Sequence, residues 1–496
     1  MPTEDEVCQC MNVLAEAYRI LKSFQGNIDI LYAAKDFEQI TTDFSKELDI
    51  LWNEQDNTAD FLEKIGKAFD IVKSLDGAPR FIKAFTLCCW LDGRLTYLDI
   101  DNDGTNDKFS LFNLIPFDGT NKILEIDALN DNYEETKVQI IPKFSIYKRL
   151  RQDGNEKVNP YANRDAFSFL NGKTKNISFI SWDREINVHN LIIPSEQLQD
   201  IEDDFIVAFC PLTDKSMLEK EIKQISINGI SVNGIIVKGL ACPERIEERL
   251  KLDWQAAAEA GADLIVFPEM LGTEALEETV KRGKYNKVVQ ELCYQVRSNG
   301  GRPPVLTVLP SFWMAGKNSA TIVNFDGKIL AKQHKYVPYI NQSKHEIEAL
   351  SELAEKHYYI IHVPDVHRIA VLICADFLSI CEHSDTMLFA EAGSTLVLVP
   401  SYSRGESDFM RLLPSLKCYG TTVIWGNSCG ETRTDRVIGG CSLAGTDAVF
   451  RFNNAIMCEG KCNGVNACVF LIKLPLRLKE KENSLLSSDT VTHMIK

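Results

Sequence analysis

The chain has 496 residues, of which 45% are hydrophobic and 25% charged, the composition of an ordinary globular protein. This length exceeds what a single hydrophobic core fills, so we expect two or three domains. The formal net charge of −16 disfavours a general affinity for nucleic acid or for an anionic membrane, and we expect neither as a partner.

The cysteines and the N-terminus indicate the compartment. No apolar run approaches the roughly 18 residues that cross a bilayer. The first six residues are acidic where a secretory signal would be basic, and the 15 cysteines are an odd number. Reduced thiols explain them better than a disulfide framework. The sequence therefore predicts a cytoplasmic protein.

The first 80 residues carry a helical pattern. Thr3 followed by Glu6 has the form of a capping box, and apolar side chains then recur at helical spacing. A second run of this kind includes Phe61, Ile65 and Phe69. We predict a helical N-terminal region over residues 1–80, whose apolar faces pack on one another or bind a partner protein.

Residues 81–202 form a predicted β-rich accessory region. Short β-rich runs at 85–91, 94–100 and 109–117 are separated by Asp-Gly pairs, which favour tight turns. This pattern predicts a β-meander. From residue 152 the chain is polar and irregular, and we place a domain boundary near residue 200.

Residues 99–107 match the first half of a calcium-binding loop. Carboxylates occupy alternate positions, and Gly104 permits the sharp bend. The twelfth position is Ser110, where the loop requires a bidentate glutamate, and Asp, Asn and Gly also form plain turns. We therefore assign no metal ligand, while calcium binding stays an open alternative.

The second half begins with a buried strand and an inserted hairpin. Residues 205–211 form an apolar run of strand length, and two Asn-Gly turn signals after it predict the hairpin. A helix is expected over 243–261, followed at once by a buried strand at 264–267. Glu269 comes directly after that strand.

The apolar run at 369–373 predicts another strand buried on both faces, and Cys374 comes directly after it. Ligands of open α/β sheets bind beyond the carboxyl ends of the strands. A buried cysteine is more often a small core residue than a nucleophile. Glu269 at a matching strand end favours the nucleophile, because a thiol needs a base to attack. The pair predicts an activated thiol with a lowered pKa that labels below about pH 8.

Lys335 lies in a third stretch, where residues 321–335 have the pattern strand, turn, strand. Three motifs in order resemble those of the nitrilase, or carbon–nitrogen hydrolase, superfamily. They are its glutamate motif at 261–269, its lysine motif at 325–335 and its cysteine motif at 368–376. Segments at 390–400, 418–430 and 440–450 resemble the family's later core strands. The resemblance covers about residues 203–475 and leaves 476–496 as a polar C-terminal tail.

The resemblance implies an α/β fold, with an α-β-β-α sandwich of the nitrilase type following the helical segment and the β-rich region. It implies that Cys374 forms a thioester with an amide-like small molecule while Glu269 transfers protons. It also implies that Lys335 and the backbone N–H of Ala375 stabilise the oxyanion. No metal or organic cofactor is required, and a homodimer or a larger assembly of dimers is expected.

Departures from the family pattern concern the pocket. The family commonly has a second glutamate near the lysine, and among Glu346, Glu348 and Glu352 we favour Glu346. Ala375 stands where an aromatic residue often follows the cysteine, which favours a carboxamide, carbamoyl or ureido group over a nitrile. The interval before Glu269 is longer than usual, so we expect a remodelled pocket rim.

Tyr402 and Arg404 follow the predicted strand that ends at Pro400, and we expect them at this rim as substrate-binding residues. Arg404 is a candidate to bind a substrate carboxylate, although a solvated loop arginine is the simpler interpretation.

The sequence thus predicts a cytoplasmic amidohydrolase that cleaves a non-peptide carbon–nitrogen bond. Two alternatives stay open. One is a nitrilase-like scaffold with little or no turnover, which assembles with another protein through its N-terminal half. The other is an enzyme with the same triad that transfers the acyl group to an amine in place of water.

Overall fold

The computed structural model describes residues 4–24, 31, 33–53, 58–96, 109–110, 124–126, 136–142, 174, 177–183, 186–193, 201, 204–212, 218–227, 229–280, 284–351, 353, 355–363, 366–382, 394–403, 406–419, 421–429, 437–444, 449–453, 466–475 and 491–495. The chain divides into two compact units, each described below by itself. The first is Met1–Ile186 with Met387–Gly393, and the second is Asn187–Thr386 with Ser394–Lys496. No helix in the described ranges is long and apolar enough to span a membrane.

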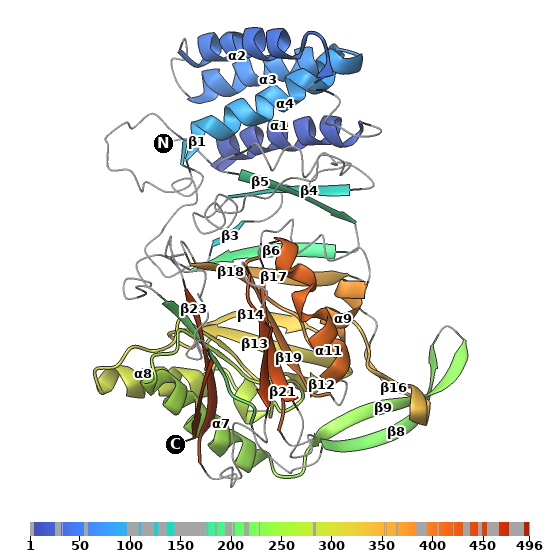
Figure 1. Cartoon of the computed structure of the whole chain (residues 1–496), viewed down its shortest axis with the longest axis vertical. Helices are drawn as coiled ribbons and strands as arrows, with labels where there is room; N and C mark the ends of the chain where they lie inside the picture. The colour runs from blue at the N-terminus through green and yellow to red at the C-terminus, as the bar shows by residue number, and fades with distance from the viewer. Residues whose placement is uncertain are drawn as a thin grey trace. The chain divides into compact units, whose positions relative to one another are not determined.

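Four helices of the first unit pack around a core of their own (Figure 1). They are α1 (Glu4–Lys22), α2 (Phe37–Asn53), α3 (Thr58–Ser74) and α4 (Gly77–Arg94). The region that we predicted to be helical, residues 1–80, contains α1, α2 and α3. Thr3, the predicted cap, lies outside the described residues.

The predicted strand at 85–91 is wrong, because these residues belong to α4. Leu87 and Cys88 lie four and three residues before Leu91, and all three are buried in the helical core. This is the spacing of one helix face. A short apolar run is compatible with either structure from sequence, and here packing against α1 and α2 decides for helix.

Short strands follow α4 in the first unit. They are β1 (Leu95–Thr96), β2 (Phe109–Ser110), β3 (Leu124–Ile126), β4 (Thr136–Pro142) and β5 (Ile177–Asp183). β1 pairs with β2 in parallel, which a meander does not do, whereas β4 and β5 are antiparallel. The possible calcium loop at 99–107 lies outside the described residues.

The second unit holds two mixed β-sheets, so its α/β character agrees with the prediction. The first sheet has the order β12-β13-β11-β10-β7-β23-β24, with β14 also paired to β13. Its strands are β7 (Asp204–Phe209), β10 (Leu264–Val266), β11 (Leu306–Val308), β12 (Phe312–Met314), β13 (Lys317–Asn324), β14 (Ile329–His334), β23 (Cys468–Pro475) and β24 (Val491–Ile495). The polar tail predicted at 476–496 therefore needs correction, because β24 extends this sheet.

The second sheet includes the order β22-β21-β20-β19-β18-β17-β6. Its strands are β6 (Ile186–Ile192), β17 (Lys356–Val363), β18 (His367–Val371), β19 (Leu396–Ser401), β20 (Thr422–Asn427), β21 (Val437–Ser442) and β22 (Val449–Asn453). β18, β19 and β20 run parallel, as β7, β10 and β11 do in the first sheet. Each sheet therefore has a row of parallel strand ends.

Helices cover one face of each sheet. α7 (Pro243–Glu259) and α8 (Lys287–Ser298) share a core with the first sheet. α11 (Glu406–Leu412) packs on the second sheet, where the Phe409 ring stacks on Trp425 at 4.9 Å between centroids. The two sheets contact each other through Phe452 and Phe470, whose ring centroids are 5.4 Å apart.

The predicted hairpin after the first strand is confirmed. It consists of β8 (Leu218–Ile227) and β9 (Ile230–Leu240), which pair in antiparallel register. β16 (Glu346–Glu348) adds in parallel to β9, and β15 (Ile340–Asn341) completes this small sheet. In Figure 1 the hairpin projects away from the two large sheets.

Candidate active site

Glu269 lies three residues beyond the end of β10. Its side chain is 1% exposed and accepts hydrogen bonds on both oxygens. The backbone N–H of Tyr402, which follows β19, donates to Oε2 at 2.9 Å. Glu269 therefore joins the two sheets at their parallel strand ends.

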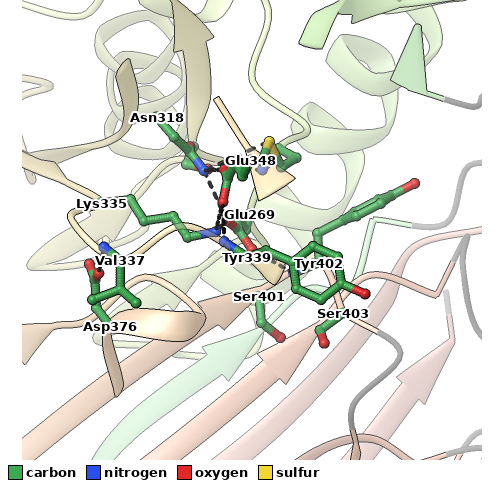
Figure 2. A network of polar contacts seen from close by, with 12 residues as sticks. Glu269, Asn318, Lys335, Val337, Tyr339, Glu348, Asp376, Ser401, Tyr402 and Ser403 are labelled. Carbon is green, nitrogen blue, oxygen red and sulfur yellow. Dashed lines mark hydrogen bonds and ion pairs between the residues drawn. The ribbon is translucent and has the colours of Figure 1, made fainter. Parts of the chain in front are cut away.

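Lys335 follows β14, and its side chain is fully enclosed. Its Nζ lies 2.7 Å from Oε1 of Glu269 and 2.6 Å from Oε2 of Glu348 (Figure 2). An isolated ammonium at such depth would be very unstable, and two carboxylates within hydrogen-bonding distance compensate its lost hydration. The sequence thus brings one cation and two anions into one buried cluster.

Cys374 occupies the turn between β18 and α9 (Ala375–Glu382). Its φ is 51°, a left-handed conformation that non-glycine residues rarely adopt and that concentrates at functional sites. The thiol is buried, and it is close enough to Glu269 for the charge of that carboxylate to raise its pKa further. Ala375 is the first residue of α9, so its N–H is among those without a carbonyl partner inside the helix.

The glutamate beside Lys335 is Glu348, so our preference for Glu346 needs correction. Both side chains leave the same face of β16, but only Glu348 is buried, and it also accepts from the backbone N–H of Tyr339 at 2.9 Å. Sequence spacing could not separate the two, since both lie on one strand face. Glu352 lies outside the described residues.

Asn318 is a site residue that the sequence analysis missed. It is completely buried at the start of β13, and its Nδ2 donates to Glu269 at 2.9 Å and to Glu348 at 3.4 Å. The amide therefore links the two carboxylates. Nothing in the sequence near Asn318 distinguishes it from other strand residues.

Asp376 was also missed as a contributor. It is buried in the first turn of α9, and its Oδ1 accepts the backbone N–H groups of Tyr336 and Val337 at 3.0 and 2.7 Å. These two residues come directly after Lys335. One carboxyl group thus fastens the lysine segment to the cysteine segment.

Tyr402 contacts Glu269 through its backbone N–H, and its side chain is half-buried, while its role in substrate binding stays a prediction. Arg404 lies outside the described residues. In the part of the chain that the structure describes, no group of three or more His, Cys, Asp or Glu side chains could hold a metal ion.

The pKa values of the cluster follow from burial and charge. Burial raises the pKa of Glu269, and the neighbouring Lys335 only partly opposes it. Burial alone would lower the pKa of Lys335, but the two carboxylates outweigh it and hold that pKa well above its ordinary value. Lys335 is therefore a fixed positive charge at neutral pH.

Burial and the negative charge of Glu269 raise the pKa of Cys374 well above its ordinary value. This is opposite to the lowered pKa that we expected from the sequence. The cluster carries two carboxylates and one ammonium, so a thiolate beside it would add a second uncompensated negative charge. Cys374 is therefore a neutral thiol beside the Glu269 carboxylate.

No protein-family model matches this chain, and no curated protein matches it. Solved structures of nitrilase-superfamily amidases resemble about half of it. A mutant of the Nesterenkonia AN1 amidase is 17% identical, with 55% of this chain and 91% of that chain covered, at a TM-score of 0.35. Another mutant, with the acetamide moiety of fluoroacetamide added at its active-site cysteine, is 16% identical over the same shares, at 0.32.

Proposed function

We propose that this protein is an amidohydrolase that cleaves a non-peptide carbon–nitrogen bond through a thioester on Cys374. The observation that carries the proposal is the buried cluster of Glu269, Lys335 and Glu348 beside a cysteine in a left-handed turn. The three motifs that resemble the nitrilase superfamily support it independently. We also propose that the second unit is an α-β-β-α sandwich, since helices cover one face of each sheet and the sheets touch each other.

Attack begins with the neutral thiol. As Sγ bonds to the carbonyl carbon, its proton passes to the Glu269 carboxylate, the neighbouring group whose charge, together with burial, raises the thiol pKa. The raised pKa of the thiol means that this transfer accompanies attack and does not precede it. Glu269 then gives the proton to the departing nitrogen as the carbon–nitrogen bond breaks.

The tetrahedral intermediate carries a negative charge on its oxygen. The Lys335 ammonium and the N–H of Ala375 are placed to stabilise it, and donors fixed in a dry site need no reorganisation as the charge develops. Glu348 holds Lys335 in place by a hydrogen bond, and Asn318 does the same for Glu269. Glu269 next removes a proton from water, whose oxygen attacks the thioester, and the thiol recovers that proton when it leaves.

Replacing the proposed nucleophile tests this function. We expect Cys374→Ala to abolish ammonia release from a panel of small amides while the melting temperature stays close to that of the wild type. Cys381→Ala is the matched control, because Cys381 lies at the far end of α9 from Cys374, has no role in the proposed reaction and should keep full activity. In Glu269→Gln, which slows deacylation, mass spectrometry should find an acyl adduct on Cys374. Equal ammonia release from Cys374→Ala and wild type would overturn the proposal.

A further inference from the structure

The hairpin β8–β9 is the feature of the second unit that the proposed mechanism does not use. In the sequence it lies between β7 and Glu269. Its strand β9 pairs with β16, the strand that contains Glu348. A hairpin tied to the catalytic cluster can also present side chains to the substrate. The candidates are the hairpin residues that lie on the same face as Glu348.

The strand register identifies that face. Glu348 pairs with Ile235 of β9, and Ile235 pairs with Ile222 of β8. Directly paired residues lie on the same side of a sheet, and so do residues two apart on one strand. Lys220 therefore leaves the hairpin on the Glu348 face, whereas Glu221 and Lys223 leave it on the other.

A contact places Lys220 beside the site. Its Nζ lies 5.6 Å from the centroid of the Tyr402 ring, within the range of a cation–π interaction. Tyr402 is the residue whose backbone N–H binds Glu269. Tyr402 thus contacts the Lys220 ammonium through its ring and the proposed base, Glu269, through its backbone N–H.

Lys220 forms no ion pair with any residue that the structure describes. Its neighbours Lys223 and Lys238 both form ion pairs with Glu221, at 3.1 and 2.7 Å, on the opposite face. Among the described residues no carboxylate lies within ion-pair distance of Lys220, and its side chain is exposed. An exposed lysine that lies beside Tyr402 and has no carboxylate partner among the described residues is suited to bind an anionic group of a substrate.

We propose that Lys220 binds a carboxylate carried by the substrate at the end remote from the scissile amide, so that the enzyme prefers monoamides of dicarboxylic acids. This inference rests on the proposed function and names its substrate class. Lys220 would act as a specificity residue, on binding and not on bond cleavage. Its loss should therefore raise KM for acidic amides far more than it lowers kcat.

The test compares amides that differ only in charge at the far end. Succinamate is matched with 4-methylpentanamide, and glutaramate with 5-methylhexanamide, where an isopropyl group replaces the carboxylate. We expect wild type to have a higher kcat/KM for at least one acidic amide than for its neutral match. Lys220→Met should reduce that ratio about 10-fold, the size of one charge-assisted contact, and Lys220→Glu should reduce it further. Lys223→Met, on the same strand and the opposite face, should leave the ratio unchanged.

The outcomes separate this inference from the function on which it rests. If the wild type releases no ammonia from any of the four amides and forms no adduct on Cys374, the proposed function fails and this inference with it. If the amides are hydrolysed without preference for the acidic ones, or if Lys220→Met leaves the preference intact, only this inference is overturned. Added salt should weaken the preference in wild type and not in Lys220→Met.

Discussion

Lys335 is the residue whose surroundings most constrain the site. Two carboxylates bind its ammonium in a cluster closed to solvent, and removing one partner of a buried charge pair typically costs about 3–5 kcal/mol. The cluster also determines the protonation of Glu269, because burial raises the pKa of this carboxyl group and the negative charge of Glu348 raises it further. Stability and catalysis therefore depend on the same three side chains.

Glu348 and Glu346 offer a matched test of this cluster. We expect Glu348→Gln to lower kcat/KM about 100-fold, as is usual when one electrostatic element of an active site is lost. Glu346→Gln, on the same strand face but without the Lys335 contact, should stay near wild type. Steady-state kinetics on one amide would measure both. Equal losses in the two variants would contradict the assignment of Glu348.

The pH profile shows whether Glu348 acts on Glu269 or only supports the fold. Glu269 must be ionised to accept the thiol proton, so kcat/KM should fall as the pH drops through its raised pKa. Removing the negative charge of Glu348 makes Glu269 easier to ionise. The acidic limb of the Glu348→Gln profile should therefore shift to lower pH, while a merely structural defect would leave it in place.

Glu269 and Cys374 were predictable because each follows a strand whose apolar run is visible in the sequence, whereas Lys335 was predicted from a strand-turn-strand pattern and from the resemblance of its motif. Glu269, Lys335 and Cys374 lie where those strands or their turns deliver them. Asn318 was not predictable, since its role depends on pairing between β13 and β14, which places it beside Lys335. The raised pKa of Cys374 was also beyond the sequence, because depth of burial decides it.

At the scale of elements, Asp376 holds the start of α9 to the segment after β14. Its Oδ1 accepts two buried N–H groups, and burial raises its pKa to about 7. Asp376→Ala should lower the free energy of unfolding by about 2 kcal/mol or more, because an unsatisfied buried donor costs about 1–3 kcal/mol. It should also lower kcat/KM, since Lys335 loses its fixed position relative to Cys374. Denaturant unfolding and steady-state kinetics would measure the two effects.

Asp376→Asn is the control for this prediction, because its amide oxygen can accept the same two N–H groups. It should keep most of the stability and activity. The folded pKa lies above the ordinary carboxyl value, so Asp376 favours folding at low pH, and this contribution is lost as pH rises toward 7. That pH dependence should be weaker in Asp376→Asn. An asparagine variant as damaged as the alanine variant would mean that charge, and not hydrogen bonding, fixes the segment.

Elements were predictable where local pattern and tertiary packing agree. The hairpin β8–β9 and the buried strands β7, β10 and β18 were found from their apolar runs and turn residues. α4 was missed because a short apolar run fits a helix and a strand alike. β24 was missed because its place depends on pairing with β23, and the local sequence does not indicate this pairing.

At the scale of the whole molecule, the two units have separate cores. The four helices of the first unit enclose one apolar cluster, and α7 and α8 form another with the first sheet of the second unit. Every described residue of the proposed site belongs to the second unit, from Lys220 to Tyr402. The proposed catalytic activity can therefore be tested without the helical unit.

A shortened chain that begins at Asn187 tests this separation. Because all strands of the first sheet, the parallel strands β18, β19 and β20 of the second sheet and the charged cluster lie beyond that residue, we expect the shortened protein to fold and to keep kcat/KM within about threefold of the full chain, a free-energy difference below 1 kcal/mol. Circular dichroism and ammonia release would measure fold and activity, and the same truncation with Cys374→Ala sets the background. A shortened protein that is folded but inactive would show that the helical unit contributes directly to catalysis, which neither the site geometry nor the separate cores predict.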